Sequence, residues 1–111
     1  MAADERISEK ELSQHVVNLA KMLGWKVARW PTWRPTGTDA GVPDLIMVRE
    51  GQVLFVELKA EKGKLTPAQE DWAYQIDGAY HGSADAYPWR PWYYVWRPAD
   101  WFGGKIDAVL A

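Results

Sequence analysis

Apolar residues recur at helical spacing between residues 8 and 23, and this pattern predicts an amphipathic first helix. Ser8 and Glu11 are spaced as a capping box at its start, and Gly24 follows as a C-terminal stop. Because Glu11 would turn back to the Ser8 amide, Glu9 is the acid that we expect to point toward the inside of the fold. An acid in the first turn also complements the helix dipole, so a purely structural role for Glu9 stays open.

A second pattern lies in residues 43–60, where two apolar runs rich in β-branched residues flank a short polar segment. Such a pattern predicts a β-hairpin. With Glu50 and Gly51 as a two-residue loop, Arg49 faces Gln52. The register of the two strands then follows by counting back from the loop.

The predicted register brings charged residues together among the most apolar residues of the chain. Asp44 lies directly opposite Glu57, and the alternation of side chains along a strand places Lys59 on the same face. The residues that point to the other face are Leu54, Val56 and Leu58. Since both faces are largely apolar, we expect a sheet that is covered on both sides.

Opposed carboxylates need a physical reason, because like charges that face each other destabilise a sheet. A divalent cation bound by Asp44 and Glu57 supplies one, since carboxylate oxygens suit Mg²⁺ or Mn²⁺. Lys59 would then orient or help to activate an attacking water, or stabilise charge on a phosphate. A different interpretation is an ordinary cluster of salt bridges on the sheet surface of a structural protein.

Residues 66–69 are typical of a helix start, with Thr66 as the N-cap, Pro67 at the first position and Gln69 at the third. A capping role is available to Gln69, because the third residue of a capping box reaches back to the N-cap amide. We expect this second helix to end near Gly78. Its predicted core stripe consists of Leu65, Ala68, Trp72 and Ile76.

The remaining segments are predicted from their turn residues and β-branched runs. We expect a strand over 26–30, a loop over 31–41, a flexible basic loop over 60–64, a strand over 92–96, a polar corner with a short helix over 97–102 and a weak closing segment over 106–110. Residues 79–91 have no readable pattern and look like an insertion.

Several motifs stand in the order found in a known nuclease family. The pattern Gly41-x-Pro43-Asp44 followed by Glu57-x-Lys59 resembles the PD-(D/E)xK nuclease core. Three further motifs indicate one family within this nuclease group. They are Gly24-Trp25, Gly63-Lys-Leu-Thr-Pro-Ala-Gln69 and Val95-Trp96-Arg97-Pro98-x-Asp100. Together these motifs resemble the small stand-alone VRR-NUC proteins, many of them from phages. The resemblance spans nearly the whole chain.

The resemblance implies an α/β fold with a restriction-endonuclease-like central mixed β-sheet flanked by helices, in a single domain over residues 1–111. It implies hydrolysis of DNA with Mg²⁺, or with Mn²⁺ in its place, held by Glu9, Asp44, Glu57 and the backbone carbonyl of Leu58. Lys59 would assist the attacking water, and Gln69 would have a functional place near the metal. The resemblance also suggests a homodimer that cleaves branched DNA, such as a four-way (Holliday) junction or a flap.

The charge of the chain opposes part of this interpretation. The formal net charge is −2, which does not favour strong non-specific binding to DNA. Residues 26–64 nevertheless carry seven Lys and Arg against five Asp and Glu, so we expect a local basic face that contacts the substrate. Its predicted members are Arg29, Arg34, Lys59, Lys62 and Lys64. The alternative is a nuclease-like fold that binds DNA or a protein partner without cleaving it.

The amino-acid composition excludes several other kinds of site and of protein. The chain has 111 residues and no cysteine, which excludes a disulfide framework, a thiol nucleophile and a cysteine-based zinc site. No apolar run approaches the roughly 20 residues that span a bilayer, and the N-terminus has no apolar leader segment. We therefore expect no membrane partner and an intracellular, cytoplasmic protein, with a phage gene in a bacterial host as one source.

Overall fold

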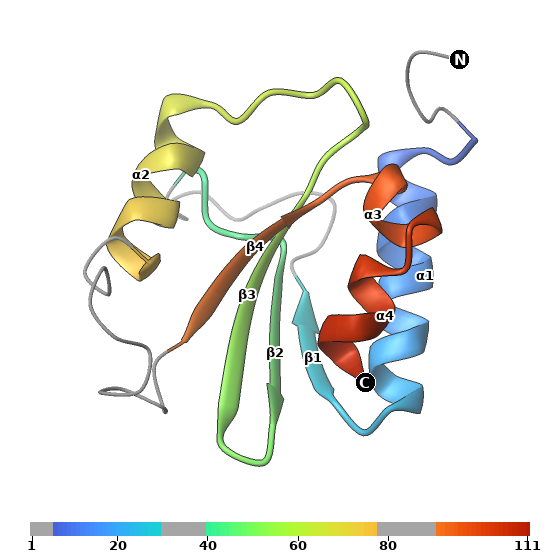
Figure 1. Ribbon diagram of the computed structural model, residues 1–111. Coiled ribbons are helices and arrows are strands. Elements are labelled where there is room, and N and C mark those ends of the chain that lie inside the picture. The colour runs from blue at the N-terminus through green and yellow to red at the C-terminus, as the bar shows by residue number, and fades with distance from the viewer. Residues whose placement is uncertain (1–5, 30–39, 78–90) are drawn as a thin grey trace.

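In the computed structural model, residues 6–29, 40–77 and 91–111 are described, and they form a four-stranded mixed sheet with helices (Figure 1). The elements in chain order are α1 (Glu9–Met22), β1 (Lys26–Arg29), β2 (Leu45–Arg49), β3 (Gln52–Leu58), α2 (Pro67–Asp77), β4 (Trp92–Trp96), α3 (Pro98–Phe102) and α4 (Lys105–Leu110). The predicted α/β fold is confirmed and is consistent with a restriction-endonuclease-like fold. Predictions for residues 31–39, which include Arg34, and for 79–90 lie outside the described residues.

The sheet has the strand order β1-β2-β3-β4, with the first two pairs antiparallel and β3 parallel to β4. Glu50 and Gly51 both have positive φ angles, 48° and 84°, as a tight two-residue hairpin turn requires. Arg49 pairs with Gln52, so the predicted register is confirmed. No helix in the three described stretches is long and apolar enough to cross a membrane.

The first helix begins and ends as predicted. The Ser8 hydroxyl accepts a hydrogen bond from the Glu11 amide, and the Glu11 carboxylate accepts one from the Ser8 amide, both at 3.1 Å. At the other end Gly24 has a φ of +91°, and the Trp25 amide donates to the Ala20 carbonyl at 2.9 Å. Glu11 is thus used by the cap, whereas Glu9 takes no part in it.

The core lies on one face of the sheet, where α1 and α4 run side by side (Figure 1). It includes Leu12, Val16, Ala20, Leu45, Met47, Leu54, Val56, Leu58, Ile106 and Leu110. The closing segment is therefore not weak, as predicted, but a helix that buries Ile106 and Leu110 completely. The side chains of Trp25 and Arg49 both donate to the Leu110 carbonyl, at 2.9 and 3.0 Å, and so fasten α4 to the sheet.

In the described part of the chain, the second face of the sheet is less covered than the core face. Ile46 and Phe55 are half-buried there, and Val48 is 37% exposed. Helix α2 lies beside β4, on the opposite side of the molecule from α1 and α4 (Figure 1). Because of this marginal position it contributes no fully buried residue, so its predicted core stripe is only half-buried.

Candidate functional site

Asp44 stands at the entry to β2, and its carboxylate folds onto the end of β3. The Oδ2 atom accepts a hydrogen bond from the amide of Leu58, the last residue of β3, at 2.9 Å. Leu45 pairs with Val56, so the next position places Asp44 opposite Glu57, as predicted. Because the amide and the carbonyl of one strand residue point to the same side, the Leu58 carbonyl is also directed toward Asp44.

Glu57 is a buried carboxylate with an ordered amide partner. Its side chain is 2% exposed, and its Oε1 atom accepts a hydrogen bond from Gln69 Nε2 at 2.8 Å. The Oε1 atom of Gln69 accepts the Thr66 amide at 2.9 Å, and Thr66 Oγ1 accepts the Gln69 amide at 3.2 Å. Gln69 therefore has both proposed roles at once, the capping box of α2 and a place beside the predicted metal ligand.

Gly41 allows the segment that carries Asp44 to lie against α2. Its φ is +83°, and a Cβ atom at this position would come within 2.5–2.7 Å of backbone atoms of Ala68 and Gln69. The contact is supported by Trp72, whose Nε1 atom donates to the Ala40 carbonyl at 3.1 Å. Only glycine fits this approach, which explains why the segment before Asp44 begins with one.

Glu9 reaches the same end of the sheet from the start of α1. Its carboxyl accepts a hydrogen bond from the backbone of Ala60 and lies within electrostatic reach of Asp44 and Lys59. Burial raises the pKa of Glu9, and the negative charge of Asp44 raises it further, while Lys59 and the Ala60 hydrogen bond oppose the shift. The structure thus places Glu9, rather than Glu11, within electrostatic reach of Asp44.

The carboxylates do not form a closed metal cage. Among the described residues, no three Asp, Glu or His side chains lie close enough together to hold a metal ion. The opposed pair of Asp44 and Glu57 still fits Mg²⁺ chemically, because this ion binds through one or two carboxylates and keeps water or substrate oxygens as its other ligands. The Leu58 carbonyl is a further oxygen on the side of Asp44.

Tyr93 is a site residue that the sequence analysis missed. It pairs with Phe55 across the parallel strands β3 and β4, which places it on the same face as Glu57. Burial raises the pKa of Tyr93 to about 12, and the negative charges of Glu57 and Asp44 add to the shift. The hydroxyl therefore keeps its proton at neutral pH and is a hydrogen-bond donor beside the carboxylates.

The predicted basic residues do not all lie on the face of the sheet that carries Glu57. Arg29 pairs with Leu45 and so lies on the face of the sheet opposite to Glu57. Lys62 and Lys64 are exposed on the segment that follows β3 and Lys59. Of the predicted basic residues in the described stretches, Lys62 and Lys64 therefore lie on the segment that carries the chain away from the carboxylates.

That segment, which we expect to be a flexible loop, forms a turn that is held by hydrogen bonds. The Gly63 amide donates to the Ala60 carbonyl at 3.0 Å, and the Arg97 side chain binds both of these residues. An open pocket of about 360 Å³ lies between residues 6–8, Glu11 and residues 60–63. Lys62 is part of its lining.

Comparison with known proteins identifies the family of this chain. A family model described as the VRR-NUC domain matches residues 2–82, which include α1, the hairpin with Asp44 and Glu57, and α2 with Gln69. No curated protein and no solved structure matches the chain. Tyr93 and Arg97 lie beyond the matched range. Because the match covers most of the chain, the protein belongs to the VRR-NUC family and contains a nuclease-type domain.

Proposed function

We propose that the protein is a divalent-metal-dependent endonuclease that hydrolyses phosphodiester bonds in DNA. The observation that carries the proposal is the opposed pair of Asp44 and Glu57, with Lys59 one residue beyond β3 on the face of Glu57. Family membership supports a nuclease, and the donor atoms support the metal. An ordinary salt-bridge cluster is less favoured, because Glu57 is buried against an amide donor rather than exposed to solvent.

We propose that Mg²⁺, or Mn²⁺ in its place, is held by Asp44, Glu57 and the Leu58 carbonyl, with Glu9 close to Asp44. When bound, the ion would neutralise the opposed carboxylates, polarise the scissile phosphate and make water a better nucleophile. Asp44 is held by the Leu58 amide and Glu57 by Gln69, so both ligands are oriented before a metal arrives. Such preorganisation lowers the cost of assembling the site.

The other side chains act on the substrate. Lys59 would hold the attacking water or stabilise negative charge on the phosphate, and hydrolysis would proceed in line without a covalent intermediate. The Tyr93 hydroxyl would donate a hydrogen bond to a phosphate oxygen on the same face. Lys62 and Lys64 would contact the nucleic-acid backbone at a distance from the reacting phosphate, so affinity should fall as salt increases.

The substrate that we propose is branched DNA, such as a four-way junction or a flap, cleaved by a homodimer. The test is incubation of the purified protein with labelled junction, flap and linear duplex DNA, in Mg²⁺, Mn²⁺ or EDTA. We expect cleavage only with metal and fastest on a branched substrate, and light scattering checks the dimer. Equal cleavage of the linear duplex would refute the structural selectivity, and binding without cleavage under every metal would favour a catalytically silent module.

A further inference from the structure

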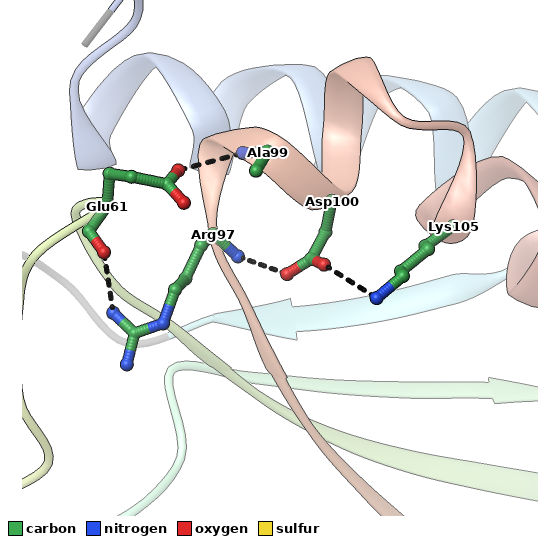
Figure 2. Close-up of polar contacts among 5 residues, drawn as sticks. All are labelled: Glu61, Arg97, Ala99, Asp100 and Lys105. Carbon is green, nitrogen blue, oxygen red and sulfur yellow. Dashed lines mark hydrogen bonds and ion pairs between the residues drawn. The ribbon is translucent and has the colours of Figure 1, made fainter. Parts of the chain in front are cut away.

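Arg97 links the end of β4 to the segment that follows Lys59. Its Nη1 atom donates to the Ala60 carbonyl at 2.8 Å and to the Gly63 carbonyl at 2.6 Å. The Glu61 carbonyl lies 3.5 Å from the same nitrogen, the longest of the three contacts (Figure 2). A guanidinium is planar and always charged, so it can hold two carbonyls in a fixed arrangement. The whole turn over residues 60–63 is gathered around this group.

Glu61 on this turn and Lys59 just before it are also bonded to residues that follow or end β4. The Glu61 carboxylate accepts the Ala99 amide at 2.9 Å, and the Asp100 carboxylate accepts the Arg97 amide at 2.8 Å (Figure 2). The amide of Lys59 donates to the Trp96 carbonyl at 3.0 Å. The main chain on both sides of Ala60 is thus attached to residues 96–99.

The turn over residues 60–63 also contacts two of the proposed catalytic residues, Lys59 and Glu9. A Cβ atom at Gly63 would lie 3.5 Å from Cδ of Lys59, so the Lys59 side chain passes directly beside the residue that Arg97 binds. Ala60, the other residue that Arg97 binds, also provides the backbone hydrogen bond to the Glu9 carboxyl. A shift of this turn would therefore move the surface against which Lys59 lies and the partner of Glu9.

We propose that Arg97 is a positioning residue, which fixes the turn over residues 60–63 and through it the location of the Lys59 ammonium. The inference rests on the proposed nuclease function, because the value of the arrangement lies in the role of Lys59. Arg97 itself is bonded to backbone carbonyls of the turn and does not need to touch the substrate. Its effect through Lys59 is on the rate of cleavage, and because Lys62 lies on the same turn, a smaller effect on DNA affinity accompanies it.

The test compares three variants of the full chain. Arg97→Met keeps a long side chain without donors, and Arg97→Lys restores donors in a less rigid form. Lys105→Met is the matched control, because Lys105 is 79% exposed and pairs with Asp100 at 3.8 Å in the same corner without contacting the turn (Figure 2). Single-turnover cleavage and DNA affinity are measured for each variant. In metal-free protein, amide exchange at Gly63 and acetylation of the Lys59 amine, relative to that of the exposed Lys26, are followed as well.

For Arg97→Met we expect cleavage slower by at least about tenfold, because small displacements of a catalytic group are costly in rate. DNA affinity should fall by less than the rate does, since only Lys62 of the DNA-contacting residues lies on this turn, while Gly63 exchange and Lys59 acetylation become faster. Arg97→Lys should recover part of each effect, and Lys105→Met should match the wild type. In a Lys59→Ala background, Arg97→Met should cause a much smaller loss of rate than in the wild type, since most of its effect passes through Lys59.

Unchanged exchange and acetylation in Arg97→Met would overturn the inference, as would a full additional loss of rate in the Lys59→Ala background. If the wild type does not cleave DNA, the proposed function fails. The exchange and acetylation measurements then decide by themselves whether Arg97 positions Lys59.

Discussion

Gln69 donates to the buried carboxylate of Glu57 through the same amide group that caps α2. The direction of this amide is set by both neighbours. Its oxygen faces the Thr66 amide hydrogen at 2.9 Å, so its NH₂ group faces Glu57 at 2.8 Å. The opposite orientation would set a donor against a donor and an oxygen against a carboxylate. The start of α2 and the orientation of Glu57 are therefore coupled.

Gln69→Glu separates the two roles of this residue. The new carboxylate can still accept the Thr66 amide, so the cap is kept, but it replaces a donor beside Glu57 by a like charge. We expect the free energy of unfolding at pH 7.5 to fall by about 1–3 kcal/mol, because like charges repel strongly where burial limits screening. Uptake of one proton by the two carboxyl groups would remove this repulsion. The stability should therefore be recovered as the pH falls and a proton is taken up.

Urea unfolding at pH 7.5 and pH 5 measures this effect, with Gln75→Glu as the control. Gln75 faces Asp71 one turn away on the exposed side of α2, so the same change there should cost less than about 0.5 kcal/mol. Equal losses in the two variants would show that the environment of Glu57 is not special.

Gly41→Ala tests the close approach of the Asp44 segment to α2. Gly51 is a matched control, because its φ of +84° is nearly the same as the +83° of Gly41, yet no atom lies within 4 Å of its hypothetical Cβ. Gly51→Ala should cost about 1 kcal/mol, the penalty for a left-handed backbone alone. Gly41→Ala adds a collision with the backbone of Ala68 and Gln69, and should cost at least about 2 kcal/mol more. Thermal or urea unfolding of both variants checks the difference, and equal losses would contradict the packing described here.

Tyr93→Phe removes the hydroxyl beside the carboxylates. At pH 8 we expect cleavage slower by about fivefold, since a hydrogen bond to a phosphate oxygen is worth roughly 1 kcal/mol. Tyr74→Phe is the control, because Tyr74 is 65% exposed on α2. Equal rates for the wild type and Tyr93→Phe would remove Tyr93 from the site.

The raised pKa of Tyr93 also predicts a change at alkaline pH. The pKa in the folded protein is about 12 and the ordinary value is 10.0, so the hydroxyl ionises more easily in the unfolded chain. Its contribution to stability is fully present below pH 10 and is lost as the pH rises toward 12. The wild type should thus lose about 1 kcal/mol relative to Tyr93→Phe over this range, after allowance for solvent screening. Urea unfolding of both proteins near pH 10 and near pH 12 measures this loss of stability.

The local rules of chain geometry were sufficient to find the carboxylate pair. The Glu50-Gly51 turn sets the register, and the two-residue period of a strand then carries it to Asp44 and Glu57. The capping signals at Ser8 and Thr66 likewise depend on neighbours in sequence. These predictions were right because each rests on contacts within one hairpin or one helix turn.

The missed features depend on contacts between distant segments. Tyr93 meets Phe55 through a parallel pairing that no local signal announces, although alternation along residues 92–96 does put Tyr93 and Val95 on one face. The sequence does not predict the closing helix α4, because six residues are too few for a periodic pattern. The four-residue spacing of Ile106 and Leu110 is its only helical signal. Arg97 binds carbonyls, and backbone acceptors have no sequence signature.

The central claim is that Asp44 is a ligand in a metal-dependent nuclease centre. Asp44→Asn is the sharpest change, because the amide oxygen can still accept the Leu58 amide at the end of β3 while the negative charge is lost. Asp71→Asn, an exposed position on α2, is the control. Cleavage of DNA is measured in Mg²⁺ for both variants, with urea unfolding to verify that each is folded. We predict a loss of at least about 100-fold for Asp44→Asn and none for Asp71→Asn. A folded Asp44→Asn variant that cleaves DNA at the wild-type rate would contradict the account.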